Sequence, residues 1–168
     1  MKPISFNTEM VKTILKEKKT VIRCVVKFKQ GQNPEWSGYI PEGAVIYGSN
    51  NIPAAKAPFQ IGDILWVQET FRVDYLSNIP GSGRVRYKDG TYMDIRFSPE
   101  RYDMMRHAQK KPGWRPNKNM PKEAARILLQ VKNVWAERVQ DHNLWMWVIE
   151  LELYRSQCQK DSTMETLY

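Results

Sequence analysis

The sequence predicts an α+β fold, a small mixed β-barrel with few and short helices, and three observations carry this prediction. Residues 20–26, 64–73, 126–139 and 144–154 are rich in β-branched and aromatic side chains, and such runs favour strands. A clear helical period is confined to residues 9–17. The strands do not alternate with long helices, so the pattern differs from that of a parallel sheet with crossover helices.

The first two elements are a capped helix and a strand. Asn7 and Thr8 are residue types that favour the position just before a helix. From residue 9 onwards the apolar side chains fall on one helical face and the charged ones on the other. Residues 20–26 form an apolar, β-branched run that predicts a strand.

Residues 30–60 have a different character. Four glycines and four prolines interrupt every periodic pattern in this segment. The sequence therefore predicts a long loop, ordered or mobile, with at most a short strand at residues 44–47. A loop of this length within a compact domain is usually functional or mobile.

Residues 62–73 predict a strand in which a carboxylate shares a face with apolar side chains. Alternation places Glu69 with Leu65, Val67 and Phe71. A buried carboxylate needs a partner. Arg23 and Arg115 are the candidates if the role is structural, which we favour. The alternative is a carboxylate in a cleft that accepts hydrogen bonds from the edge of a base.

Two hairpins follow. Asp89-Gly90, between strand-like residues 84–87 and 92–95, is a strong hairpin signal. Residues 98–111 read as helical or irregular, and residues 112–121 contain three prolines that exclude regular structure. The strands at 126–139 and 144–154 are separated by four residues and should pair antiparallel, with Trp145 and Trp147 in the core. We expect a single domain over residues 1–155 and a polar tail over residues 156–168.

The charge is uneven along the chain of 168 residues, whose net charge is +8. Residues 1–29 and residues 101–126 each hold eight basic and two acidic residues, a net charge of +6 for each block. If folding brings these blocks together, they form a face for a polyanion. The alternative is a set of solvated, solubilising side chains.

The second basic block contains a candidate ligand-binding loop. Trp114 is a candidate for stacking on a base. The cations that follow it could contact phosphates, and Pro116 and Pro121 would hold the loop rigid. These cations are Arg115, Lys118, Lys122 and Arg126.

Several classes of protein are disfavoured. No apolar run approaches the roughly 20 residues of a membrane span, and the N-terminus lacks the apolar stretch of a signal peptide, so we expect a cytoplasmic protein. Cys24 and Cys158 are read as unpaired thiols. His107 and His142 lie far apart and outside any Cys/His ligand pattern, so no metal and no cofactor are expected.

Segments spread over nearly the whole chain resemble the ASCH domain, and in particular bacteriophage-encoded ASCH proteins. They are KPISFNTEMV at residues 2–11 with KTVIR at 19–23, GDILWVQET at 62–70, and WRP at 114–116 with MPKEAAR at 120–126, closed by WMWVIE at 145–150. Their order and spacing carry the resemblance. It implies a PUA-like antiparallel pseudo-β-barrel with short helices packed at its side and a cleft, in a protein of the host-cell cytoplasm.

The resemblance implies a module that binds RNA, single-stranded or modified nucleic acid, or a nucleotide in a basic cleft. The expected ligand-binding residues are Lys19, Thr20, Arg23, Glu69, Trp114, Arg115, Lys118 and Lys122.

Some small ASCH proteins are amidohydrolases that act on an acylated cytidine, and this chain departs from their pattern. The position of the catalytic threonine is Ile22, which has no hydroxyl. The insertion that brings the catalytic glutamate is reduced to residues 140–143. An enzyme on a modified nucleoside is therefore disfavoured and no catalytic residue is assigned. A further alternative is a phage factor that engages a host or virion protein through residues 30–60.

Overall fold

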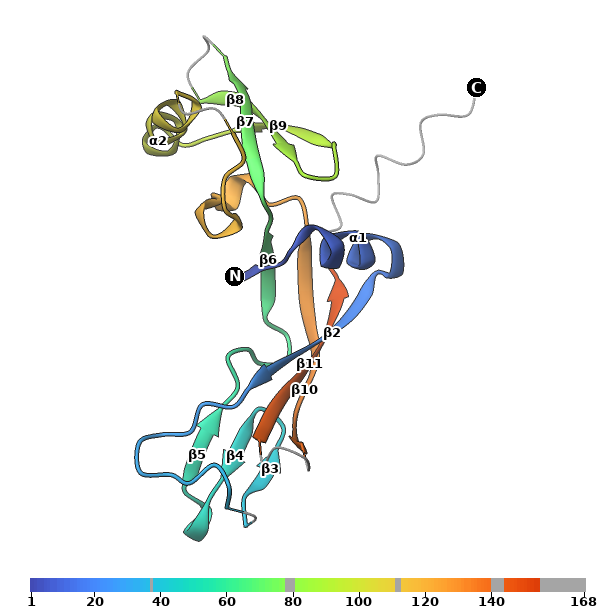
Figure 1. The fold of residues 1–168 in the computed structure, drawn as a ribbon, viewed down its shortest axis with the longest axis vertical. Helices are drawn as coiled ribbons and strands as arrows, with labels where there is room; N and C mark the ends of the chain where they lie inside the picture. The colour runs from blue at the N-terminus through green and yellow to red at the C-terminus, as the bar shows by residue number, and fades with distance from the viewer. Residues whose placement is uncertain (37, 78–80, 111–112, 140–143, 155–168) are drawn as a thin grey trace. The chain divides into compact units, whose positions relative to one another are not determined.

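The computed structural model of the chain describes residues 1–36, 38–77, 81–110, 113–139 and 144–154 (Figure 1). The expected turn at 140–143 and the tail, with His142 and Cys158, lie outside these residues. The described elements are mostly strands. In chain order they are β1 (Lys2–Ser5), α1 (Thr8–Glu17), β2 (Lys19–Val25), β3 (Ile40–Glu42), β4 (Val45–Tyr47), β5 (Pro53–Lys56), β6 (Ile64–Gln68), β7 (Phe71–Leu76), β8 (Ser82–Tyr87), β9 (Tyr92–Arg96), α2 (Pro99–Gln109), β10 (Leu128–Val139) and β11 (Leu144–Leu153), with short 3₁₀ helices at Ser49–Asn51, Asn117–Asn119 and Lys122–Ala124.

These elements confirm the α+β class, with strands that are mainly antiparallel. The hydrogen-bonded strand order is β1-β6-β10-β11-β2 in one sheet, β3-β4-β5 in a second and β7-β8-β9 in a third. The pairing of β1 with β6 is parallel, whereas β10, β11 and β2 pair antiparallel. The predicted β-barrel is not seen, because none of the sheets formed by the described residues closes, and β1 and β2 are the two edges of the five-stranded sheet. The expected hairpins β8–β9 and β10–β11 are both present.

The described chain separates into two compact units. Unit 1 comprises Met1–Glu17 and Leu65–Leu128, and unit 2 comprises Lys18–Ile64 and Leu129–Tyr154. The first basic block of the sequence is divided between them, because residues up to 17 belong to unit 1 and those from 18 onwards to unit 2.

The core of unit 1 lies on one face of the sheet β7-β8-β9. Phe71, Val85 and Tyr87 alternate with partly exposed neighbours and are fully buried, as the period of two requires. Met105 of α2 and Met120 pack against them. Removing side chains of this size from water stabilises the fold by roughly 1.5–3 kcal/mol each.

Unit 2 contains the most extensive difference from the sequence prediction. The predicted long loop at residues 30–60 is wrong at Ile40–Glu42 and Pro53–Lys56, where β3 and β5 pair with β4 in a small antiparallel sheet. The strand β4 itself corresponds to the short strand expected at residues 44–47. The prolines do not prevent this pairing because Pro41 lies in β3, at the edge of the sheet, and Pro53 is the first residue of β5. Ile46 and Ala54 of this sheet are completely buried. Trp145 and Trp147 are buried in β11, as predicted.

The predicted strand at 62–73 is two strands, β6 and β7, separated at Glu69 and Thr70. Residues 65, 67, 69 and 71 are all buried, which confirms the predicted alternation. The strand hydrogen bonding is interrupted because the Glu69 N–H donates to Met120 Sδ at 3.0 Å instead of to a neighbouring strand. Phe71 then pairs with Arg115 in an isolated bridge.

Candidate functional site

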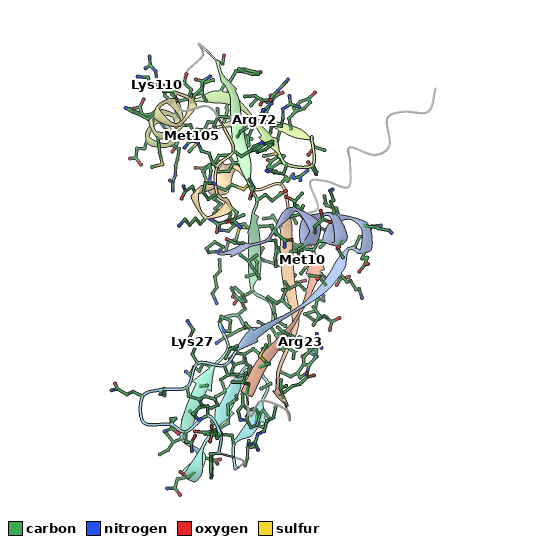
Figure 2. The ribbon with its side chains drawn as sticks, in the orientation of Figure 1. Met10, Arg23, Lys27, Arg72, Met105 and Lys110 are labelled. Atoms are coloured by element: carbon green, nitrogen blue, oxygen red, sulfur yellow. The ribbon has the colours of Figure 1, made fainter. Side chains whose placement is uncertain are left out.

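A cationic pocket of about 780 Å³ lies within unit 1. Its walls come from α2, from the end of β6 and the start of β7, and from residues 115–120. Figure 2 labels Met105 and Lys110 at α2 and its C-terminal end. The volume is within the range of small-molecule and cofactor sites.

Basic side chains dominate the polar part of the lining. Arg101, Lys110, Arg115 and Lys118 line the pocket together with His107, and the lining contains no Asp or Glu. Four cations around one concave, low-dielectric surface raise the local concentration of anions. The pocket is therefore suited to a phosphate-bearing ligand.

The floor of the pocket is apolar and partly aromatic. Phe71 is fully buried, and Met105 and Met120 are nearly so. Trp66 is half-buried and also lines the pocket. Aromatic and thioether side chains pack well against a flat ring, so the floor suits the planar part of a ligand.

Hydrogen bonds hold the loop at residues 115–120 in place. The Arg115 N–H donates to Phe71 O at 2.7 Å, and the Phe71 N–H donates to Arg115 O at 3.3 Å. The Gln68 amide donates to Lys118 O at 3.4 Å, and the Asn117 amide donates to Phe6 O at 3.4 Å. Since its backbone is fixed, the loop presents Arg115 and Lys118 with little ordering cost on binding.

A buried ionic network lies beside the pocket and includes Glu69. The Arg126 guanidinium donates to Glu69 through two bonds, Nε to Oε1 at 2.9 Å and Nη2 to Oε2 at 2.6 Å. It also contacts Asp89 at 2.7 Å and the hydroxyl of Thr91, and it lies 4.1 Å from the centre of the Tyr87 ring. Glu69 is thus buried and paired with an arginine, as the structural interpretation expects. The observed partner is Arg126, whereas the sequence analysis named Arg23 and Arg115 as candidates and considered Arg126 only for phosphate contacts.

The network shifts the pKa values of Asp89 and Tyr87. Burial alone would raise the pKa of Asp89, but hydrogen bonds from Thr91 and Arg126 outweigh it and hold that pKa below its ordinary value. Burial and the nearby Glu69 carboxylate raise the pKa of Tyr87. Two carboxylates share one guanidinium, so removal of Arg126 would leave two buried negative charges.

Trp114 is adjacent to Arg115 in sequence but lies apart from the pocket lining. Its ring centre is 5.3 Å from the Arg72 guanidinium carbon and 5.2 Å from Lys88 Nζ. Side chains alternate along an extended segment, so Trp114 and Arg115 face opposite sides of the bridge to β7. The tryptophan is 41% exposed.

The predicted site residues therefore fall into separate places. Arg115 and Lys118 line the pocket, Glu69 is buried next to Met120, and Lys122 is exposed in its 3₁₀ helix. Lys19, Thr20 and Arg23 lie in β2 of unit 2, the first and last exposed and Thr20 half-buried. A face formed from both basic blocks stays a prediction.

Sequence reasoning missed much of the pocket. Arg101, Met104, Met105 and Lys110 come from α2 or its end, a segment that the sequence left as helical or irregular. The available signal was its position inside the second basic block. Gln68 and Phe71 both line the pocket although the alternation of burial places them on opposite faces, because the strand breaks between them, with Gln68 ending β6 and Phe71 beginning β7.

No family model, curated protein or solved structure matches the chain. Fold and site alone define its class, an α+β protein rich in antiparallel strands with a cationic pocket over an apolar floor. No helix of the described part of the chain combines the length and apolarity needed to cross a membrane. The described residues also contain no group of three or more His, Cys, Asp or Glu side chains that could hold a metal ion.

Proposed function

We propose that the pocket of unit 1 binds a nucleotide unit, as part of RNA, of single-stranded or modified nucleic acid, or as a nucleotide. The observation that carries this proposal is the lining itself, four cations and no carboxylate around an aromatic and thioether floor. The cations are suited to contacts with phosphate, and the aromatic and thioether floor is suited to the face of a base.

Different side chains of the lining would contact the phosphate and the base. Arg101 and Arg115 present planar guanidinium groups that can contact phosphate oxygens in pairs, and Lys118 acts as a point charge. Gln68 and Asn119 carry amides with both donors and acceptors, which suit the edge of a base. The apolar floor accommodates the face of the base.

The proposal includes membership of the ASCH group, with a PUA-like arrangement of the bacteriophage-encoded type. It is supported by the order and spacing of the segments at 2–23, 62–70, 114–126 and 145–150. In this proposal Lys19, Thr20 and Arg23 contribute to ligand binding as well, and the protein acts in the cytoplasm of the host cell.

The test is fluorescence anisotropy with labelled oligouridine and oligothymidine strands at several salt concentrations. Each phosphate neutralised on a single strand contributes about −0.7 to the slope of log K against log salt. Three to five contacts would give a slope of roughly −2 to −3.5. The pocket variant is Lys118→Ala, and Lys132→Ala is its charge-matched control, because Lys132 lies outside the pocket and outside both basic blocks. A wild-type protein without saturable binding at low salt would overturn the proposal.

A further inference from the structure

The outer face of the sheet β7-β8-β9 carries a ladder of aromatic and basic side chains. Val85 and Tyr87 of β8 point into the core, so Arg84 and Arg86 point outwards. In the paired register Arg84 lies between Tyr75 and Asp94. Arg86 lies between Arg72 and Tyr92. Trp114 extends this face beside Arg72 and Lys88.

Each of the three aromatic rings is both exposed and in contact with a cation. Tyr75 is 44% exposed and Tyr92 is 55% exposed. The Arg84 guanidinium carbon lies 4.1 Å from the centre of the Tyr92 ring and 5.3 Å from that of Tyr75. Each ring therefore keeps part of its surface exposed to solvent, with a positive charge next to it.

Carboxylates hold the arginines of the ladder in place. Arg84 binds Asp94 through two parallel bonds, Nε to Oδ1 at 2.7 Å and Nη2 to Oδ2 at 2.8 Å. Asp74 accepts from Arg86 at 2.7 Å and from Arg72 at 2.9 Å. Together with Lys88, four cations face two carboxylates, so the face keeps a net positive charge and its guanidinium groups are ordered in advance.

We infer that this face binds single-stranded nucleic acid, with bases stacked on Tyr75, Tyr92 and Trp114 and with phosphates near the cations of the ladder. Exposed aromatic rings interleaved with basic residues bind unpaired bases with little dependence on sequence. A duplex would be excluded, because its bases are already stacked on one another. The face lies on the opposite side of the sheet from the pocket lining at Phe71 and Arg115, and the inference does not rest on the proposed function of that pocket.

The net charge of the face favours nucleic acid over a protein partner. Tyr, Trp and Arg are enriched at protein–protein interfaces as well, but here every ring has a cation against it and the cations outnumber the carboxylates. The positive excess complements a phosphate backbone.

The test compares a Tyr75→Leu/Tyr92→Leu double variant with the wild-type protein by anisotropy, using a labelled oligouridine strand, its duplex with oligoadenosine, and labelled UMP. One stacked base contributes roughly five-fold to over a hundred-fold in affinity. We expect the double variant to bind the single strand at least about tenfold more weakly, with an unchanged salt slope and unchanged binding of UMP. Tyr154→Leu, an exposed tyrosine outside the ladder, is the matched control.

The pocket variant Lys118→Ala separates this inference from the proposed function. It should weaken the binding of UMP, and if it does not, the pocket proposal fails while the ladder inference stands. Trp114→Leu gives a second, independent ladder variant, and thermal melting checks that each variant is folded. Wild-type affinity of the folded ladder variants for the single strand, or equal binding of strand and duplex, would overturn the inference. A protein ligand that is lost in the ladder variants while oligouridine binding is retained would assign the face to a protein partner instead.

Discussion

Arg126 is the cation that pairs with two buried carboxylates beside the pocket. It is shared by Glu69 and Asp89, whose side chains are only 6% and 12% exposed. A buried ion pair contributes little net stability, but removal of one partner leaves an uncompensated charge. The position is therefore sensitive to substitution although it lies outside the pocket lining.

We predict that Arg126→Met destabilises the protein by about 3–5 kcal/mol, because two buried carboxylates lose their cation. Urea unfolding at neutral pH measures this. Glu69→Gln should cost less, because Arg126 and Asp89 remain as a balanced pair. A loss of less than about 1 kcal/mol for Arg126→Met would contradict the account of the network.

The two lysines at either end of the 118–122 segment should behave differently. Lys118→Ala should weaken the binding of oligouridine and reduce the magnitude of the salt slope by about 0.7, the contribution of one phosphate contact on a single strand. Lys122→Ala should have little effect, because Lys122 is exposed and does not line the pocket. Anisotropy titrations at several salt concentrations decide between them. Equal effects of the two substitutions would place the ligand outside the pocket.

The helix α1 shows what can be predicted at the scale of an element. Asn7 was expected to cap it, and Asn7 Oδ1 accepts from the Met10 N–H at 2.8 Å. Val11 and Ile14 of the predicted apolar face are buried, while Leu15 is exposed. The cap is a local interaction within four residues, so the sequence carries all the information it needs.

Asn7→Ala should destabilise the protein by about 1 kcal/mol, because an N–H of the first helical turn loses its acceptor. Asn7→Asp retains an acceptor at the same place and should keep stability near the wild-type value. Chemical denaturation of the three proteins gives the comparison. If the aspartate variant were as unstable as the alanine variant, the cap would not be the cause.

Hairpins were also predictable, whereas the small sheet of unit 2 was not. Asp89-Gly90 marks a tight turn whose geometry is local, and Gly90 has a positive φ of 92° that favours glycine. The strands β3 and β5 are three and four residues long and contain prolines. Both become strands because they pair with β4, and β5 also buries Ala54 and Ala55. Neither the pairing nor the burial can be predicted from the local sequence pattern.

At the scale of the whole molecule, three aspartates link stability to pH. A hydrogen bond from Arg84 holds the pKa of Asp94 below its ordinary value. At Asp74 and Asp89 burial opposes this effect, but hydrogen bonds from Arg86 and Arg72, and from Thr91 and Arg126, still lower the pKa of each carboxyl. All three belong to unit 1.

A pKa that is lower in the folded than in the unfolded state gives stability that is present above the unfolded value and is lost as the pH falls. We therefore expect stability to be level near neutral pH and to decline below about pH 4, the ordinary pKa of aspartate. Thermal melting between pH 7 and pH 3 measures it. Asp89→Asn should reduce the decline, since it removes the most buried of the three carboxyls. An unchanged decline in that variant would assign the acid sensitivity to other groups.

The sequence by itself determined the local features of this protein. The cap of α1, the alternation through Leu65 and Phe71, the turn at Gly90 and the antiparallel pair β10–β11 follow from interactions between residues close in the chain. Only the tertiary structure decided the partner of Glu69, which is 57 residues away in Arg126. It also decided the pocket, because residues between 66 and 120 meet there, and the separation of Trp114 from Arg115. Such contacts depend on how buried surfaces pack, and periodicity specifies which face of an element is buried but not what lies against it.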